Sequence, residues 1–207
     1  LEHLGAYGID ADALAHRAIS KGAPGYPLVV EEFGKFILTE DGEIDRARLG
    51  RLVFTDPQAL TRLESFVHPL VTQALDFLIR RAAQPVVVIE AIKLLEASIH
   101  KSCDAVWVVT APETAQISRL VQKRGMSVAE ARRRLANQSP QEQKVKAAQV
   151  VIHNSGNIEG TWKKVVLAWR RNVPFAIEEA APIVEAAGEL QVLRGRPRDS
   201  EAIAALI

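Results

Sequence analysis

Three runs of β-branched residues constrain the fold more than any other feature of this sequence. Residues 85–91, 105–111 and 149–153 are continuous apolar stretches rich in valine and isoleucine. Such runs are typical of strands buried on both faces of a parallel sheet, because helices cover both sides of that kind of sheet. The three runs therefore predict an α/β fold, provided that helices lie between them.

Helix-forming segments do separate the three runs. Residues 112–124, 127–137 and 158–170 carry helical composition, and a short helix is expected at 94–98. Ser127 and Glu130 have the spacing of a capping box at the start of the second of these helices. Strands that alternate with helices form parallel βαβ units.

A fourth strand is expected near the beginning of the chain, at residues 7–11, and a long helical stretch follows it. Asp45 and Asp56 are placed to cap two helices of this stretch, and Pro57 stands at the first position of the second. The expected helices cover residues 13–20, 27–36 and 46–54, one from 57 to about His68-Pro69, and one from there to about 83.

Composition excludes several classes of protein. The 207 residues are 48% hydrophobic and 25% charged, with a net charge of +1, so nothing favours nucleic acid or a membrane surface as the main partner. No stretch approaches the ~20 apolar residues that cross a bilayer. The single cysteine, Cys103, fits a reducing compartment such as the cytoplasm, and its apolar surroundings favour a small buried residue over a nucleophile.

The sequence lacks the common motifs of nucleotide binding, nucleophilic catalysis and metal binding. There is no Gly-x-x-x-x-Gly-Lys-Ser/Thr loop, no Gly-x-Gly-x-x-Gly, no nucleophile elbow, and no histidine pattern with metal-ligand spacing. Carboxylates at strand ends remain, namely Asp10, Asp12 and Glu90, together with a basic helix. Such residues can take a proton from a hydroxyl and neutralise phosphate charge, which is what phosphoryl transfer requires.

Asp10 and Asp12 allow two interpretations. If both lie in a strand they point to the same side, near the strand end where open α/β sheets bind ligands. Alternatively, Asp12 caps the following helix and Asp10 is a solvated turn residue. The two residues alone favour the second, structural interpretation, and the rest of the chain favours the first.

Three consecutive arginines, Arg132, Arg133 and Arg134, lie in the basic helix. Consecutive helical residues are ~100° apart, so the three cannot all face one ligand. The helix is either a solvated basic surface or a mobile flap that presents one arginine to a polyphosphate.

From residue 1 to about residue 169, the order of these motifs resembles the bacterial dephospho-CoA kinase family. The matching residues in the first half are Ile9-Asp10-Ala11-Asp12, Phe33-Gly34, Asp41-Gly42, Asp45-Arg46 and His68-Pro69-Leu70, followed by Leu94-Leu95-x-x with Glu96 in the segment after the run at 85–91. Those in the second half include Ala111-Pro112, Arg119-Leu120, Gly125-Met126-Ser127, Arg134, Gln138 and His153-Asn154-Ser155-Gly156.

The resemblance implies a P-loop kinase of the nucleoside-monophosphate-kinase type. It would transfer the γ-phosphoryl group of ATP, with Mg²⁺, to the ribose 3′-hydroxyl of dephospho-CoA, and both substrates are small molecules. The implied roles are the general base for Asp12, the metal–phosphate region for Asp10 and Glu90, the acceptor site for His68, Pro69 and Glu96, and the nucleotide site for Arg134, Asn154 and Gly156.

The same resemblance implies a division of residues 1–171. The core comprises 1–12, 84–118 and 147–171, the helical acceptor-binding region is 13–83, and the lid is 119–146. The family's phosphate-binding loop is expected before Leu1. Residues 172–190 are expected to be a linker, and 191–207 resemble the first strand and helix of a GNAT-type acetyltransferase, or else form a helical tail.

Four places in the sequence depart from the family pattern. His16 stands where arginine is usual, Ile92-Lys93-Leu94 where Pro-Leu-Leu is usual, His153 where aspartate is usual, and Arg124 in place of a common acidic lid residue. Two other functions stay open at this point. The chain could be a non-catalytic module that binds CoA or dephospho-CoA beside an acetyltransferase, or a kinase for another nucleoside or a shikimate-type acceptor.

Overall fold

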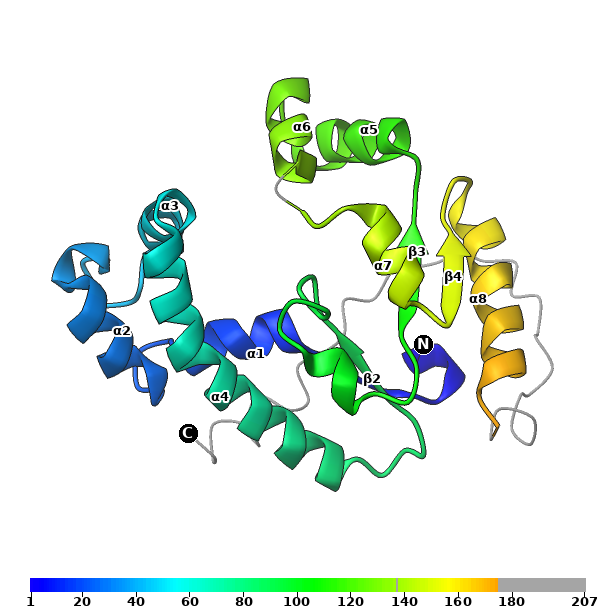
Figure 1. The fold of residues 1–207 in the computed structure, drawn as a ribbon, viewed down its shortest axis with the longest axis horizontal. Helices are drawn as coiled ribbons and strands as arrows, with labels where there is room; N and C mark the ends of the chain where they lie inside the picture. The colour runs from blue at the N-terminus through cyan, green and yellow to red at the C-terminus, as the bar shows by residue number, and fades with distance from the viewer. Residues whose placement is uncertain (137, 175–207) are drawn as a thin grey trace. The chain divides into compact units, whose positions relative to one another are not determined.

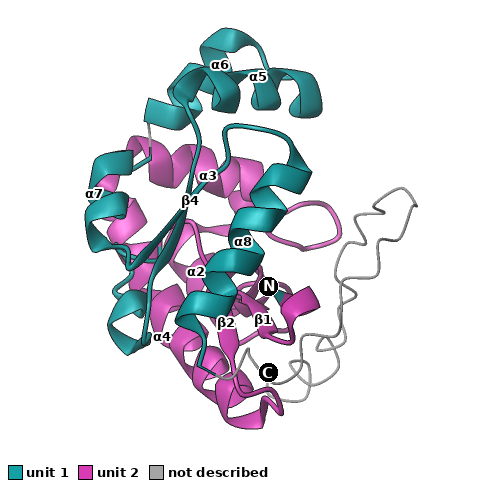
Figure 2. Ribbon diagram, turned by 90° about the vertical axis from the view of Figure 1, so that its right-hand side faces the viewer, with its two compact units in different colours: residues 1, 94–181 teal, residues 2–93, 182–207 magenta. Residues whose placement is uncertain are grey.

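The structure is a computed structural model that describes residues 1–136 and 138–174. Within these residues the chain forms two compact units, residues 2–93 and residues from 94 onward (Figure 2). The predicted domain at 191–207, nearly all of the predicted linker and position 137 of the predicted basic helix lie outside the described residues.

The unit of residues 2–93 contains one pair of parallel strands, β1 (Tyr7–Asp10) and β2 (Val87–Glu90). Tyr7 lies opposite Val87, and Asp10 lies opposite Glu90. The 76 residues between the strands form the crossover that parallel pairing requires, from Ala11 to Val86.

Helices make up most of this crossover. They are α1 (Ala11–Ala18), α2 (Gly25–Phe33), α3 (Arg46–Thr55) and α4 (Pro57–Arg81), with the short 3₁₀ turn η2 (Lys35–Ile37). A second 3₁₀ turn, η1 (Glu2–Leu4), precedes β1. Both predicted caps are confirmed. Asp45 accepts hydrogen bonds from the amides of Ala47 and Arg48, and Asp56 accepts one from Gln58, with Pro57 at the start of α4.

The predicted break at His68-Pro69 is wrong, because α4 runs through it as one helix of 25 residues. A proline inside a helix removes one hydrogen bond and costs about 3 kcal/mol. Packing offsets this cost, since Ala59 on one side of Pro69 and Val71, Leu75 and Leu78 on the other are all buried. Figure 1 shows α1, α2 and α3 lying along α4, and all three contact it.

The core of this unit lies among α2, α3, the residues that connect them, the end of α1 and the start of α4. Val29 and Ile37 are completely buried and pack with six further buried residues, which are Ile19, Phe33, Ile44, Leu49, Val53 and Ala59. Close packing also explains Gly25, because a Cβ at this position would lie 2.5 Å from the carbonyl oxygen of Ala18.

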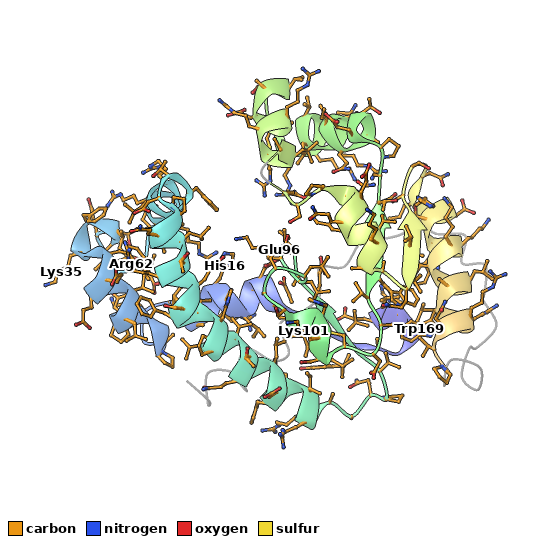
Figure 3. All side chains as sticks on the ribbon, in the orientation of Figure 1. His16, Lys35, Arg62, Glu96, Lys101 and Trp169 are labelled. Atoms are coloured by element: carbon orange, nitrogen blue, oxygen red, sulfur yellow. The ribbon has the colours of Figure 1, made fainter. Side chains whose placement is uncertain are left out.

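The second unit also contains a pair of parallel strands, β3 (Trp107–Thr110) and β4 (Val150–His153). Its helices are α5 (Glu113–Arg124), α6 (Val128–Ala136), α7 (Gln141–Ala147) and α8 (Ile158–Asn172), and η3 (Ile99–Ser102) is a 3₁₀ turn. α8 packs on β4. Trp169 of α8, labelled in Figure 3, is buried and forms a T-shaped contact with Trp107, with 6.4 Å between the ring centres.

Local signals in this unit were predicted with mixed success. The capping box is confirmed, because Ser127 and Glu130 exchange hydrogen bonds between backbone amides and side chains. The short helix expected at 94–98 is wrong: these residues form turns, and Ser98 takes a left-handed conformation before η3. α7 was not predicted, since its seven residues bury no side chain and so carry no apolar stripe.

The two parallel pairs, each with its helices, agree with the predicted α/β class. Within residues 1–136 and 138–174, every helix is too short or too polar to span a lipid bilayer.

Candidate functional site

The carboxylates predicted at the strand ends lie together in the unit of residues 2–93. Asp10 and Glu90 are register partners at the carboxyl ends of β1 and β2, and both are exposed. Parallel α/β sheets bind ligands at this edge, so the two side chains stand where a ligand is expected.

The roles of Asp10 and Asp12 at the start of α1 differ from both sequence interpretations. Asp10 is the cap, since its Oδ1 accepts a hydrogen bond of 2.9 Å from the amide of Ala13. Asp12 lies in the first helical turn. The strand ends at Asp10, so the spacing of two residues no longer places both carboxylates on one face.

Asp12 is held by the loop that follows β2. Its Oδ2 accepts a hydrogen bond of 3.1 Å from the backbone amide of Ile92, eighty residues away in sequence. Among the described residues only this amide donates to the carboxylate, so Oδ1 is open to another donor. Asp12 is half-buried and therefore both positioned and accessible.

His16, labelled in Figure 3, lies on α1. It comes four residues after Asp12, and this helical spacing puts both residues on the same side of the helix. Protein packed around part of the ring lowers the pKa of His16, and the Arg46 guanidinium lowers this pKa further. Asp12 and Asp10 act on the His16 pKa in the opposite direction but more weakly. The imidazole is therefore neutral at neutral pH, beside the carboxylate of Asp12.

The structure leaves the predicted acceptor residues His68 and Pro69 exposed on α4. The carbonyl of His68 accepts a hydrogen bond from the hydroxyl of Thr72, one turn later. Glu96 belongs to the other unit, where its carboxylate accepts a hydrogen bond from the Ser139 hydroxyl. The predicted acceptor roles of all three residues stay predictions.

In the unit from residue 94 onward, Arg119 of α5 binds the loop after β4. Its Nη2 donates to the carbonyl oxygen of Asn154 at 2.9 Å, to the Oδ1 of Asn154 at 3.2 Å, and to the carbonyl of Gly156 at 3.5 Å. Thr161 donates a further hydrogen bond to the Asn154 Oδ1. The two predicted nucleotide residues of this loop are thus joined to α5 by one guanidinium.

Arg119 also lines a cavity of about 250 Å³ against α5 and α6. Four of its lining residues are cationic, namely Arg119, Lys123, Arg124 and Arg134. The other lining residues are Gln116, Leu120, Leu135 and Gln138. Such a concentration of positive charge, with two amides and two leucines, suits a polyphosphate attached to an apolar ring system.

Of the three consecutive arginines, only Arg134 lines this cavity. Helix geometry thus keeps Arg132 and Arg133 away from this cavity, and which arginine faces a ligand stays a prediction. The cavity residues Lys123 and Arg124 were missed as site residues, and Arg119 was named only as a motif. A pattern in the sequence points to this face of α5. Gln116, Arg119 and Lys123 are three and four residues apart, a spacing that puts all three on one face of a helix.

Cys103 and possible metal-ligating side chains are the remaining features of the described residues. Partial burial raises the pKa of Cys103, and nearby Asp104 raises it further, so the side chain stays a thiol at neutral pH. No group of three or more His, Cys, Asp or Glu side chains within residues 1–136 and 138–174 is arranged to hold a metal ion.

Comparison with known proteins identifies relatives along most of the chain. The family described as dephospho-CoA kinase matches residues 1–160. Dephospho-CoA kinase from Carboxydothermus hydrogenoformans is 41% identical over 169 residues, which cover 80% of this chain and 82% of the relative. The same enzyme from Aquifex aeolicus is 42% identical over 163 residues, with 78% and 83% covered.

A solved structure shares the fold. The crystal structure of TT1252 from Thermus thermophilus matches with a TM-score of 0.71 and 29% identity, over 83% of this chain and 87% of that one. The predicted α/β fold class is thereby confirmed.

Proposed function

This chain belongs to the dephospho-CoA kinase family, and we propose that Asp12 is its general base. The family's reaction is the ATP-dependent phosphorylation of dephospho-CoA, the final step of coenzyme A biosynthesis, so ATP and dephospho-CoA are its small-molecule substrates. The observation that carries the role of Asp12 is the hydrogen bond from Ile92, which holds one carboxylate oxygen and leaves the other free.

In the proposed reaction, the free oxygen of Asp12 accepts the proton of the acceptor's ribose 3′-hydroxyl. The hydroxyl oxygen forms a bond to the γ-phosphorus of ATP while the bond from that phosphorus to the β-phosphate oxygen breaks. ADP leaves with the bonding electrons, and the proton passes from Asp12 to solvent. A fixed carboxylate suits this step because phosphoryl transfer depends on positioning more than on covalent chemistry.

We propose Asp10 and Glu90 as the residues that face Mg²⁺ bound to ATP. Carboxylate oxygens at a strand end suit this hard cation, which keeps several waters and binds one or two carboxylates besides the substrate phosphates. When bound, Mg²⁺ supplies positive charge that neutralises the phosphates. Asp10 would take part through the oxygen that does not cap α1.

The nucleotide is proposed to bind at the cationic cavity of α5 and α6. Arg134 would contact the phosphates, and Asn154 and Gly156 would lie beside the adenine, with Arg119 holding their loop in place. His68, Pro69 and Glu96 are proposed to contact the acceptor. The lid remains proposed as residues 119–146 and the acceptor-binding region as 13–83.

Further parts of the proposal concern the protein as a whole. The 207 residues contain no Gly-x-x-x-x-Gly-Lys-Ser/Thr, so we place the family's phosphate-binding loop before Leu1, and the coding sequence upstream tests this directly. The lone Cys103 favours a cytoplasmic enzyme, and the balanced charge favours one without nucleic-acid or membrane partners. A GNAT-type domain is proposed to begin at 191–207.

Replacing Asp12 with asparagine in the full-length enzyme tests the proposed base. We expect kcat to fall by ~10²–10⁴, the usual contribution of a general base, with little change in the KM for ATP. Asp76→Asn is the matched control, because Asp76 is an exposed carboxylate on α4 of the same unit. A D12N enzyme with unchanged kcat would remove Asp12 from the mechanism.

A further inference from the structure

Ile92 and Lys93, which closely follow β2, each make a polar contact with a different helix. The amide of Ile92 donates to Asp12 on α1 at 3.1 Å, and the ammonium of Lys93 pairs with Glu64 Oε1 on α4 at 3.0 Å. Ile92 as a whole residue is 61% exposed, so apolar packing of this residue does not locate the segment.

The two helices that supply these contacts, α1 and α4, pack directly against each other. Leu14 of α1 and Leu75 of α4 are both buried. Lys93 directly follows the residue whose amide binds Asp12, and consecutive Cα atoms are only 3.8 Å apart. A displacement of Lys93 from α4 therefore moves the amide of Ile92 relative to Asp12.

We propose that the Lys93–Glu64 ion pair positions Asp12 for catalysis. Glu64 and Lys93 are positioning residues: the pair anchors the loop after β2 to α4, and the loop's amide orients the carboxylate. This inference rests on the proposed role of Asp12 as the base. It extends the site by two residues that no strand-end pattern in the sequence identifies.

The expected effect is modest, because both partners are partly exposed, at 50% for Lys93 and 35% for Glu64. Exposed ion pairs alter an equilibrium by about fivefold at most, whereas small misplacements of reacting groups cost up to ~10²-fold in rate. We therefore expect loss of the pair to lower kcat by roughly three- to tenfold.

Lys93 could instead act directly, with its ammonium leaving Glu64 and binding a substrate phosphate. This alternative predicts a different kinetic effect of replacing Glu64. Glu64→Gln would free Lys93 for the substrate, so kcat would hold and KM would stay or fall. If the pair positions Asp12, Glu64→Gln and Lys93→Met lower kcat alike and leave both KM values within twofold.

The experiment measures kcat and both KM values of the full-length enzyme for Lys93→Met, Glu64→Gln and the conservative Lys93→Arg. Lys163→Met is the matched control, because Lys163 pairs with Glu159 at 2.9 Å on α8, in the other unit. Thermal unfolding of each variant verifies that it is folded. We expect K93R and K163M to keep kcat within twofold of the original enzyme.

The decisive comparison repeats Lys93→Met in the D12N enzyme. If the pair acts through Asp12, K93M causes no further loss of kcat there. An equal loss in both backgrounds, a kcat for K93R as low as that for K93M, or an unchanged E64Q enzyme would each overturn the proposal. A D12N enzyme that itself keeps full kcat would instead refute the base assignment, so the two failures are distinguishable.

Discussion

At the scale of single residues, the site depends on where β1 stops. Asp10 and Asp12 stand two apart, and this spacing gives a shared face only inside a strand. Because the strand ends at Asp10, this residue becomes the cap of α1, and Asp12 turns toward the amide of Ile92. The point at which the strand ends thus decides that Asp10 caps the helix and that Asp12 accepts a hydrogen bond from the loop after β2.

Arg134 and Arg133 are neighbours in sequence, but only one of them lines the cationic cavity. The two residues therefore allow a matched test of the nucleotide site. Only Arg134 lines the cavity, so we expect Arg134→Met to raise the KM for ATP by roughly tenfold, as loss of a charged hydrogen bond does. Arg133→Met removes the same charge from the neighbouring position. Steady-state kinetics that show equal effects for both variants would contradict the assignment of the cavity.

At the scale of elements, α4 shows that packing can override a local breaker. The helix continues through Pro69 because its buried residues on both sides contact α1, α2 and α3. Separate helices on either side of Pro69 would each have lost part of that burial. A local rule predicted two helices, and the shared apolar surface made one.

Pro69→Ala tests this account of α4. Alanine restores the missing backbone hydrogen bond, so we expect the free energy of unfolding to rise by about 1–3 kcal/mol, measured by urea denaturation. Pro57→Ala is the control on the same helix, because the first helical position needs no amide donor, and its stability should hardly change. A loss of stability in P69A would show that the ring itself packs. The KM for dephospho-CoA, measured on the same variant, tests the proposed contact of Pro69 with the acceptor.

At the scale of the whole molecule, the proposed sites divide between the two units. The carboxylates at the ends of β1 and β2 belong to residues 2–93, and the cationic cavity belongs to the unit that begins at residue 94. Each unit has its own pair of parallel strands, so each can hold its own residues in place by its own contacts.

The helical acceptor-binding region and the cationic cavity predict different main footprints for the two substrates in hydrogen exchange of the full-length enzyme, although Glu96 is proposed to contact the acceptor from the unit that begins at residue 94. A ligand at 100 times its Kd slows exchange of the amides it stabilises by up to about 100-fold. We expect dephospho-CoA to slow exchange mainly in α1, α3 and α4, and ATP mainly in α5, α6 and the loop after β4. α8 provides an internal reference, and dephospho-CoA protection confined to residues 94–174 would contradict the proposed acceptor site.

The sequence by itself determined the features that depend on near neighbours. The four strands, the caps Asp45 and Asp56, and the capping box of Ser127 and Glu130 could all be predicted, because a strand reflects its own run of side chains and a cap binds amides two or three residues away. The strand-end carboxylates could be predicted for the same reason.

Only the tertiary structure decided which of these residues work together. Three contacts join residues that are far apart in sequence. Ile92 donates to Asp12 across 80 residues, Lys93 pairs with Glu64 across 29, and Arg119 donates to Asn154 across 35. No periodicity encodes such contacts, since they exist only once strands and helices have packed. Packing likewise allows α4 to continue past Pro69. The burial of apolar side chains before and after this residue outweighs the loss of one backbone hydrogen bond.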